Sequence, residues 1–228
     1  MRRHWGWKLR GSCDADVGGT EPLSRQFGVD RGQPIDRYYI EAFLAAHAAD
    51  ICGRVIEVGD TTYSLRFGGA QVREAAVLLP PPGGPHATVV ADLESGVGVP
   101  EGRYDCAIVT QTLHVLYGIH AAVRHCRTML RPGGVLLATI PCITQVSRYD
   151  MDRWGDYWRL TDRATERLFA EAFGADAVDV QGYGNFFAAC AFLRGLAVED
   201  ISPALLDDPD PDYHILTGVR ALAPLVTA

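Results

Sequence analysis

The chain alternates short apolar runs with amphipathic segments, and this pattern restricts it to few folds. Five apolar runs, each ending in a polar or glycine-rich turn, lie at residues 54–58, 75–79, 87–91, 104–110 and 135–140. Helical periodicity marks residues 34–51, 119–130, 161–173 and 186–196. Strands separated by helices form βαβ units, so the pattern predicts an α/β fold with a mostly parallel sheet. Two later runs, 177–180 and 213–219, are expected to form an antiparallel hairpin at the sheet edge.

Length and charge narrow the functional classes. The 228 residues suit one such domain with an extension, so we expect an N-terminal arm over 1–33 and the domain over 34–228. The net charge of −7 disfavours nucleic acid as a substrate, because its binders usually carry a basic face. Neither a signal-peptide pattern nor an apolar run of membrane-spanning length is found, so no membrane partner is expected. The six cysteines form no C-x-x-C pair, which indicates a reducing, cytoplasmic location.

The first strand-to-helix turn is the place to look for a ligand, because parallel sheets bind ligands at the carboxyl ends of their strands. It reads Glu57-Val58-Gly59-Asp60, with one glycine where a pyrophosphate loop needs three. S-adenosylmethionine has no phosphate; it needs a close backbone approach and carboxylates for its ammonium and ribose. Gly59 and Glu57 meet these needs, although a plain turn with a solvated Glu57 remains the alternative.

Four segments in order, "RVIEVGD", "ATVVADLE", "GRYDCAIVTQTLHVL" and "LRPGGVLLATIP", resemble the type 11 class I S-adenosylmethionine-dependent methyltransferases. The resemblance covers about residues 25–220. It implies a Rossmann-like, doubly wound, seven-stranded sheet with an antiparallel last strand. It also implies S-adenosylmethionine as cofactor and S-adenosylhomocysteine as product.

Carried over to this chain, the resemblance assigns the cofactor's methionine part to the first segment, with Glu57, Gly59 and Asp60. Asp92 and Leu93, after the third strand, match the position that meets the adenine. The turn over residues 111–114 lines the methyl-transfer site, where Gln111 contacts cofactor or substrate; an ordinary turn glutamine is the alternative.

The chain also departs from the family pattern. Thr61 and Tyr63 occupy positions where the family has glycines, which should narrow the loop. The ribose carboxylate expected at the end of the second strand is not clear, with Glu74 the nearest acidic residue. The segments "FGVDRGQPIDRYYIE", "FGG" and "SRYDMDRWGDYWRLT" resemble a subgroup found beside glycosyltransferases and natural-product genes. That likeness implies a small acceptor such as a sugar or natural product.

Methyl transfer to a hydroxyl gains from a base. His114 is the first candidate, because it follows the fourth strand and imidazole titrates near neutrality; a packed turn residue is the alternative. Asp150, Asp152 and Asp156 lie in the loop after the fifth strand and are further candidate bases. They could instead form a structural cap tied by Arg–Asp pairs, and their spacing alone does not define a metal site, so no metal is predicted.

Aromatic and charged residues in the same loop suit sugar-ring faces and hydroxyls. The candidate substrate contacts are Tyr149, Arg153, Trp154, Tyr157, Trp158 and Arg159. Before the first strand, Arg37 could pair with the methionine carboxylate and Tyr38 could close the pocket. The alternative for these two is a helix packed on the sheet with Arg37 solvated.

These observations predict a cytoplasmic O-methyltransferase that acts on a small hydroxylated molecule, and they are compatible with a homodimer. The alternative keeps the fold without methylation, as a cyclase or as a ligand-binding or regulatory protein.

Overall fold

A seven-stranded sheet in the order β3-β2-β1-β4-β5-β7-β6 forms the centre of the computed structural model, which describes residues 20–225. Its strands are β1 (Gly53–Val58), β2 (Val72–Leu79), β3 (Val89–Val90), β4 (Tyr104–Thr110), β5 (Leu130–Pro141), β6 (Val178–Tyr183) and β7 (Leu216–Leu222). The first five strands are parallel, and β7 runs antiparallel to β5 and β6. The predicted Rossmann-like, mostly parallel sheet is confirmed, including the antiparallel pair at one edge.

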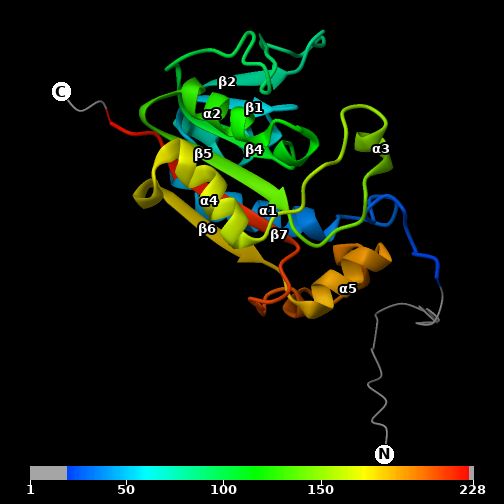
Figure 1. The fold of residues 1–228 in the computed structure, drawn as a ribbon. Helices are drawn as coiled ribbons and strands as arrows, with labels where there is room; N and C mark the ends of the chain where they lie inside the picture. The colour runs from blue at the N-terminus through cyan, green and yellow to red at the C-terminus, as the bar shows by residue number, and fades with distance from the viewer. Residues whose placement is uncertain (1–19, 226–228) are drawn as a thin grey trace, which may run out of the picture.

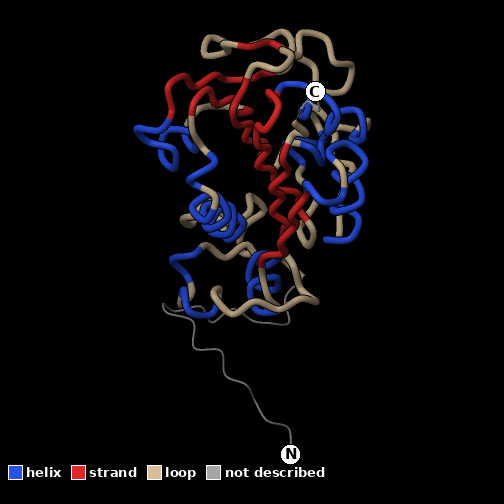
Figure 2. Tube along the Cα trace, turned by 90° about the vertical axis from the view of Figure 1, so that its left-hand side faces the viewer, coloured by secondary structure: helices blue, strands red, loops and turns tan. Residues whose placement is uncertain are grey.

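Helices cover both faces of the sheet, as Figures 1 and 2 show. On one face, α1 (Ile35–Ala46) and α5 (Phe186–Arg194) enclose one hydrophobic cluster. On the other face, α2 (Ile119–Met129) and α4 (Asp162–Phe173) enclose a second cluster. A short helix, α3 (Arg148–Met151), lies in the loop that leaves β5. The layers therefore leave the carboxyl ends of β1 to β5 uncovered by a long helix.

The local sequence explains where the main helices begin and which faces they bury. Every third or fourth residue of α2 is apolar, so Ile119, Val123 and Cys126 fall on one buried face. At the start of α4, the Thr161 side chain accepts a hydrogen bond from the Ala164 N–H. Asn185 caps α5 in the same way, and Gly195 ends that helix in the left-handed conformation.

Two local features differ from the expectation. β3 is shorter than the predicted run 87–91, and it follows loop 80–88, whose prolines at 80, 81, 82 and 85 cannot donate the hydrogen bonds of a helix. The sequence Arg131-Pro132-Gly133-Gly134 is typical of a turn, but these residues form a bulge inside β5. Its register with β4 shifts between the pairs Tyr104–Leu130 and Cys106–Val135.

Residues 20–33, the described part of the predicted arm, lie against α5 and the residues after it. The Leu23 N–H donates to the Arg194 carbonyl at 2.8 Å. Arg31 forms two hydrogen bonds to the Asp200 carboxylate, at 2.7 and 2.8 Å. The remainder of the arm, residues 1–19, lies outside the described residues, so the domain boundary stays a prediction. Between residues 20 and 225, no helix is long and apolar enough to cross a membrane.

Candidate active site

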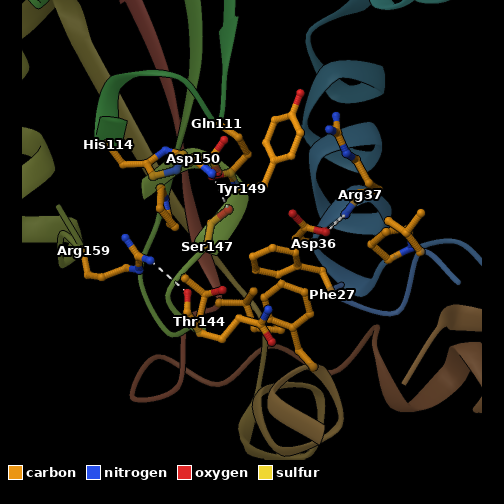
Figure 3. A pocket seen from close by; sticks show the side chains of 16 residues that line it. Phe27, Asp36, Arg37, Gln111, His114, Thr144, Ser147, Tyr149, Asp150 and Arg159 are labelled. Atoms are coloured by element: carbon orange, nitrogen blue, oxygen red, sulfur yellow. Dashed lines mark hydrogen bonds between the residues drawn. The ribbon is translucent and has the colours of Figure 1, made fainter. Parts of the chain in front are cut away.

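Two neighbouring cavities open at the carboxyl edge of the sheet. Cavity A, of about 240 Å³, is mainly apolar and lies at the ends of β1, β2, β3 and β4. Cavity B, of about 310 Å³, lies between the arm, the start of α1, the turn after β4 and the loop after β5 (Figure 3). Gln111 and Asp150 line both cavities, so a ligand in one would approach a ligand in the other at these two residues.

Gly59 gives the end of β1 its close approach to cavity A. Its φ is +99°, a conformation that favours glycine, and a Cβ built there would meet nothing within 4 Å. Because Gly59 lines cavity A, a side chain at this position would project into the space of a ligand.

Glu57 lies beneath this turn with only 3% of its surface exposed. Its carboxylate accepts hydrogen bonds from the N–H groups of Tyr63 and Ser64, at 3.1 and 2.8 Å, and from the Ser64 hydroxyl. Burial raises the pKa of Glu57. The side chain lines neither cavity, so its ammonium contact stays a prediction that would compete with these bonds. Asp60 is exposed, accepts from the Thr62 N–H at 2.7 Å, and also lies outside both linings.

The second strand supplies no ribose carboxylate. Glu74 lies near the start of β2, at the edge opposite the cavities, where it pairs with Arg54 and Arg103. Glu74 is therefore too far from the cavities to meet a ribose there, because β2 begins at Val72, earlier than the predicted run 75–79. Leu79 and Pro80 occupy the cavity end of β2.

Asp92 and Leu93 line cavity A, and their contact with an adenine stays a prediction. Asp92 accepts hydrogen bonds from the Ser95 hydroxyl at 2.7 Å and the Glu94 N–H at 2.8 Å. The Ser95 hydrogen bond is the main cause that lowers the pKa of Asp92, so this carboxylate is anionic and fixed at the cavity wall.

Gln111, in the wall shared by the two cavities, has a strained backbone. Its φ is +45°, which is uncommon for a residue with a Cβ. The conformation is held because the Gln111 N–H donates to the Thr139 carbonyl at 3.1 Å and to its hydroxyl at 3.2 Å. Strain of this kind is found mainly at functional sites, so its position between the cavities supports a role in positioning ligands.

His114 lines cavity B and is 6% exposed. Among the described residues, its Nδ1 has no hydrogen-bond partner. Burial lowers its pKa to about 4, against the opposing effect of the Asp156 carboxylate. The imidazole is therefore neutral at pH 7, which is the form in which a histidine can accept a proton.

The structure separates the three candidate carboxylates of the loop after β5. Asp150 lines both cavities, whereas Asp152 is exposed and lines neither. The side chain of Asp156 is 1% exposed and forms a two-pronged ion pair with Arg159, with N–O distances of 2.6 and 2.8 Å. Although burial acts to raise the pKa of Asp156, its hydrogen bond from Arg159 helps to lower it overall. Neither Asp152 nor Asp156 lines a cavity. The ion pair of Asp156 instead positions Arg159, which lines cavity B.

The aromatic residues of this loop also divide. Trp154 lines cavity A and Tyr149 lines cavity B, with their rings 5.9 Å apart. Arg153 stacks on the Tyr149 ring at 3.6 Å and lines neither cavity. Tyr157 and Trp158 also lie outside both linings; the Trp158 indole donates to the Leu116 carbonyl at 3.0 Å.

Two residues of α1 were candidates for cofactor contact, and they point differently. Arg37 lines cavity B and donates to the Tyr63 hydroxyl at 2.7 Å, which ties α1 to the first turn. Tyr38 lines neither cavity, and its hydroxyl donates to Asp207.

Sequence reasoning missed the aromatic side of cavity B. Phe27 of the arm and Phe192 of α5 line it, with ring centroids 5.9 Å apart. Asp36 joins them on the same side of the cavity (Figure 3). The proximity of residues 27 and 192 depends on how the arm docks on α5, and no local pattern carries that information.

Comparison with known proteins agrees with this geometry. Residues 41–138 match the family model described as a methyltransferase domain. No curated protein matches the chain.

Several solved structures share the fold. N-methyltransferase NodS from Bradyrhizobium japonicum WM9, in complex with S-adenosylhomocysteine, is 13% identical over 84% of this chain and 89% of its own, with a TM-score of 0.52. The [4+2]-cyclase SpnF is 15% identical over 90% and 87%, with a TM-score of 0.52. An O-methyltransferase family protein from Burkholderia thailandensis is 11% identical over 85% and 57%, with a TM-score of 0.52.

Residues 41–138 therefore resemble a methyltransferase domain, and the chain shares its fold with solved S-adenosylmethionine-dependent methyltransferases. The resemblance drawn from the sequence is confirmed at this level.

Protonation of His114 should couple to folding. Its pKa is about 4 in the folded chain against 6.5 for the free side chain, so the unfolded state binds more protons between these values. As the pH falls from 7.5 to 5, this residue should cost about 2 kcal/mol of stability. Urea unfolding at both pH values should show that His114→Asn loses this part of the pH dependence.

The control is His86→Asn, which changes an exposed histidine on loop 80–88 and should keep the wild-type pH dependence. Equal pH dependence in the wild type and in His114→Asn would contradict a buried neutral imidazole.

Proposed function

We propose that the chain is an S-adenosylmethionine-dependent methyltransferase that methylates a hydroxyl group of a small molecule. One observation carries the proposal: cavities A and B share the wall formed by Gln111 and Asp150. A cofactor in cavity A and an acceptor in cavity B would meet there. Such a meeting point is what a transfer between two bound molecules requires.

The residues of cavity A fit the adenosyl part of the cofactor. Leu79, Leu93 and Leu116 offer apolar surface to an adenine, and Asp92 adds a fixed hydrogen-bond acceptor. Gly59 leaves room beside the end of β1. The departure is the ribose, because Leu79 and Pro80 stand where the family has a carboxylate. The domain match and the S-adenosylhomocysteine in the NodS structure support the same cofactor.

When bound, the cofactor supplies a methyl group on a sulfonium, which an acceptor displaces in line. The chain's own contribution is to hold the two reactants and to keep water out. Trp154 lines cavity A and Tyr149 of α3 lines cavity B, and both belong to the loop after β5. One loop would therefore contact both reactants.

The proton of the acceptor goes to His114 in this proposal. The His114 side chain lines cavity B and its imidazole is neutral, so an acceptor hydroxyl in that cavity would have a proton acceptor in the wall. The imidazolium that forms would be stabilised by the carboxylates of Asp156 and Asp150, which act to raise the His114 pKa. A base of this kind supports a hydroxyl acceptor, which must lose a proton on methylation.

Replacing Gly59 should separate cofactor binding from folding. In Gly59→Ala, the added methyl group projects into cavity A, so S-adenosylhomocysteine affinity should fall at least about 10-fold in isothermal titration, since a clash of this kind costs over 1 kcal/mol. Gly174→Ala is the matched control, because Gly174 has φ +94° and open space at its Cβ but lies outside both cavities. Equal S-adenosylhomocysteine affinity in the two variants would show that the cofactor does not bind in cavity A.

Replacing His114 should slow turnover without loosening the cofactor. We expect His114→Asn to lower kcat by about 100-fold or more, the usual contribution of a general base. The assay measures S-adenosylhomocysteine release with a panel of hydroxylated acceptors, and titration measures cofactor affinity in parallel. Full activity in the variant would exclude His114 as the base, whereas a parallel loss of cofactor affinity would point to a structural role.

A further inference from the structure

One side of cavity B combines aromatic rings with a carboxylate. Phe27 lies on the same side as Asp36 (Figure 3), its ring centroid is 5.9 Å from that of Phe192, and all three residues line the cavity. His114 and Arg159 lie on the opposite side (Figure 3). If cavity B holds the acceptor, as the proposed function requires, the side with Asp36 contacts the end of the acceptor that does not react.

Phe27 is held in a strained conformation. Its φ is +58°, and in residues 20–225 only Phe27 and Gln111 combine a side chain with a positive φ. Both line cavity B, and strain that persists in a folded chain concentrates at ligand sites. The neighbouring residue, Gly28, fixes the position further: a Cβ on it would lie 2.7 Å from the Leu196 carbonyl oxygen.

The docked arm keeps the Phe27 ring in place. Arg31 is bonded twice to Asp200, and the Val198 N–H donates to the Gln33 carbonyl at 2.8 Å. Both contacts follow Phe27 in the chain, and before it the Leu23 N–H donates to the Arg194 carbonyl at 2.8 Å. The ring therefore forms a fixed apolar platform in the cavity before any ligand arrives.

The charged side chains that line cavity B differ in the partners that they have. Arg37 donates to the Tyr63 hydroxyl, and Arg159 is paired with Asp156. Asp36 accepts from the Arg37 N–H at 2.9 Å, and no ion pair to its carboxylate is found in the described part of the chain. Burial raises the pKa of Asp36 in spite of the nearby Arg37 charge. A buried carboxylate without an ion pair would be stabilised by a positively charged group of a ligand.

We propose that the acceptor presents a protonated amine to Asp36, lays the face of a ring against Phe27, and directs its reacting hydroxyl toward His114. An ammonium beside aromatic faces gains cation–π attraction as well as the ion pair. The acceptor class is thus an amine-bearing, hydroxylated ring compound. This inference rests on the proposed function for the hydroxyl only; the amine contact depends on cavity B alone.

The test compares three ring compounds of one shape that differ in one substituent. The probes are trans-4-aminocyclohexanol, trans-cyclohexane-1,4-diol and trans-4-hydroxycyclohexanecarboxylate, each titrated by NMR into the full chain with and without saturating S-adenosylhomocysteine. We expect the amine to bind at least about 10-fold more tightly than the diol, and the carboxylate to bind least, because a close charge pair contributes that much or more.

The variant Asp36→Asn keeps the shape of the side chain and removes its charge. It should weaken the amine about 10-fold while the diol changes less than about 2-fold. Asp176→Asn, which removes an exposed carboxylate outside both cavities, should leave all three probes unchanged. Phe27→Leu removes the ring and keeps an apolar side chain, so it should weaken all three probes and the amine most, because the amine also loses the cation–π attraction.

Equal affinity for the three probes, or an amine preference that survives in Asp36→Asn, would overturn the proposal. The proposal would also be overturned if Asp36→Asn weakened S-adenosylhomocysteine as much as it weakened the amine, because Asp36 would then belong to the cofactor site. Failure of the proposed function has a different signature: S-adenosylhomocysteine would not bind, while the amine preference and its dependence on Asp36 would persist in the chain alone.

Discussion

The buried carboxylate of Glu57 holds the turn on which both cavities depend. It accepts hydrogen bonds from the Tyr63 and Ser64 N–H groups and from the Ser64 hydroxyl. These bonds anchor the start of the π-helical turn Ser64–Gly68 beneath the end of β1. In the related family, glycines let this loop lie close to the ligand. Here one glycine, Gly59, makes the approach, and the carboxylate fixes the larger residues that follow.

Hydrogen bonds link the same turn to cavity B. Tyr63, held by Glu57 through its N–H, accepts a hydrogen bond at its hydroxyl from Arg37. Arg37 is adjacent to Asp36 at the start of α1, and both line cavity B. Tyr63 is thus the link between the first turn and cavity B.

Much of the architecture could be predicted from the sequence, because apolar periodicity reports local structure directly. The β4 run 104–110 and the start of α5 were predicted at their observed residues, and Asp92, a candidate from the sequence, lines cavity A. The division among Asp150, Asp152 and Asp156 could not be predicted, since all three are carboxylates in one loop and only its folded course decides which reaches a cavity. Phe27 and Phe192 were missed for the same reason: their contact depends on long-range docking.

The proposed methyl transfer requires the cofactor to bind in cavity A, beside an acceptor in cavity B. The most direct measurement is a crystal structure of the chain with S-adenosylhomocysteine. We expect the adenine against Leu93 and Leu116, and the sulfur at the wall formed by Gln111 and Asp150, facing the side of cavity B that holds His114. An adenosyl group bound in cavity B, or a sulfur turned away from Gln111, would contradict the account.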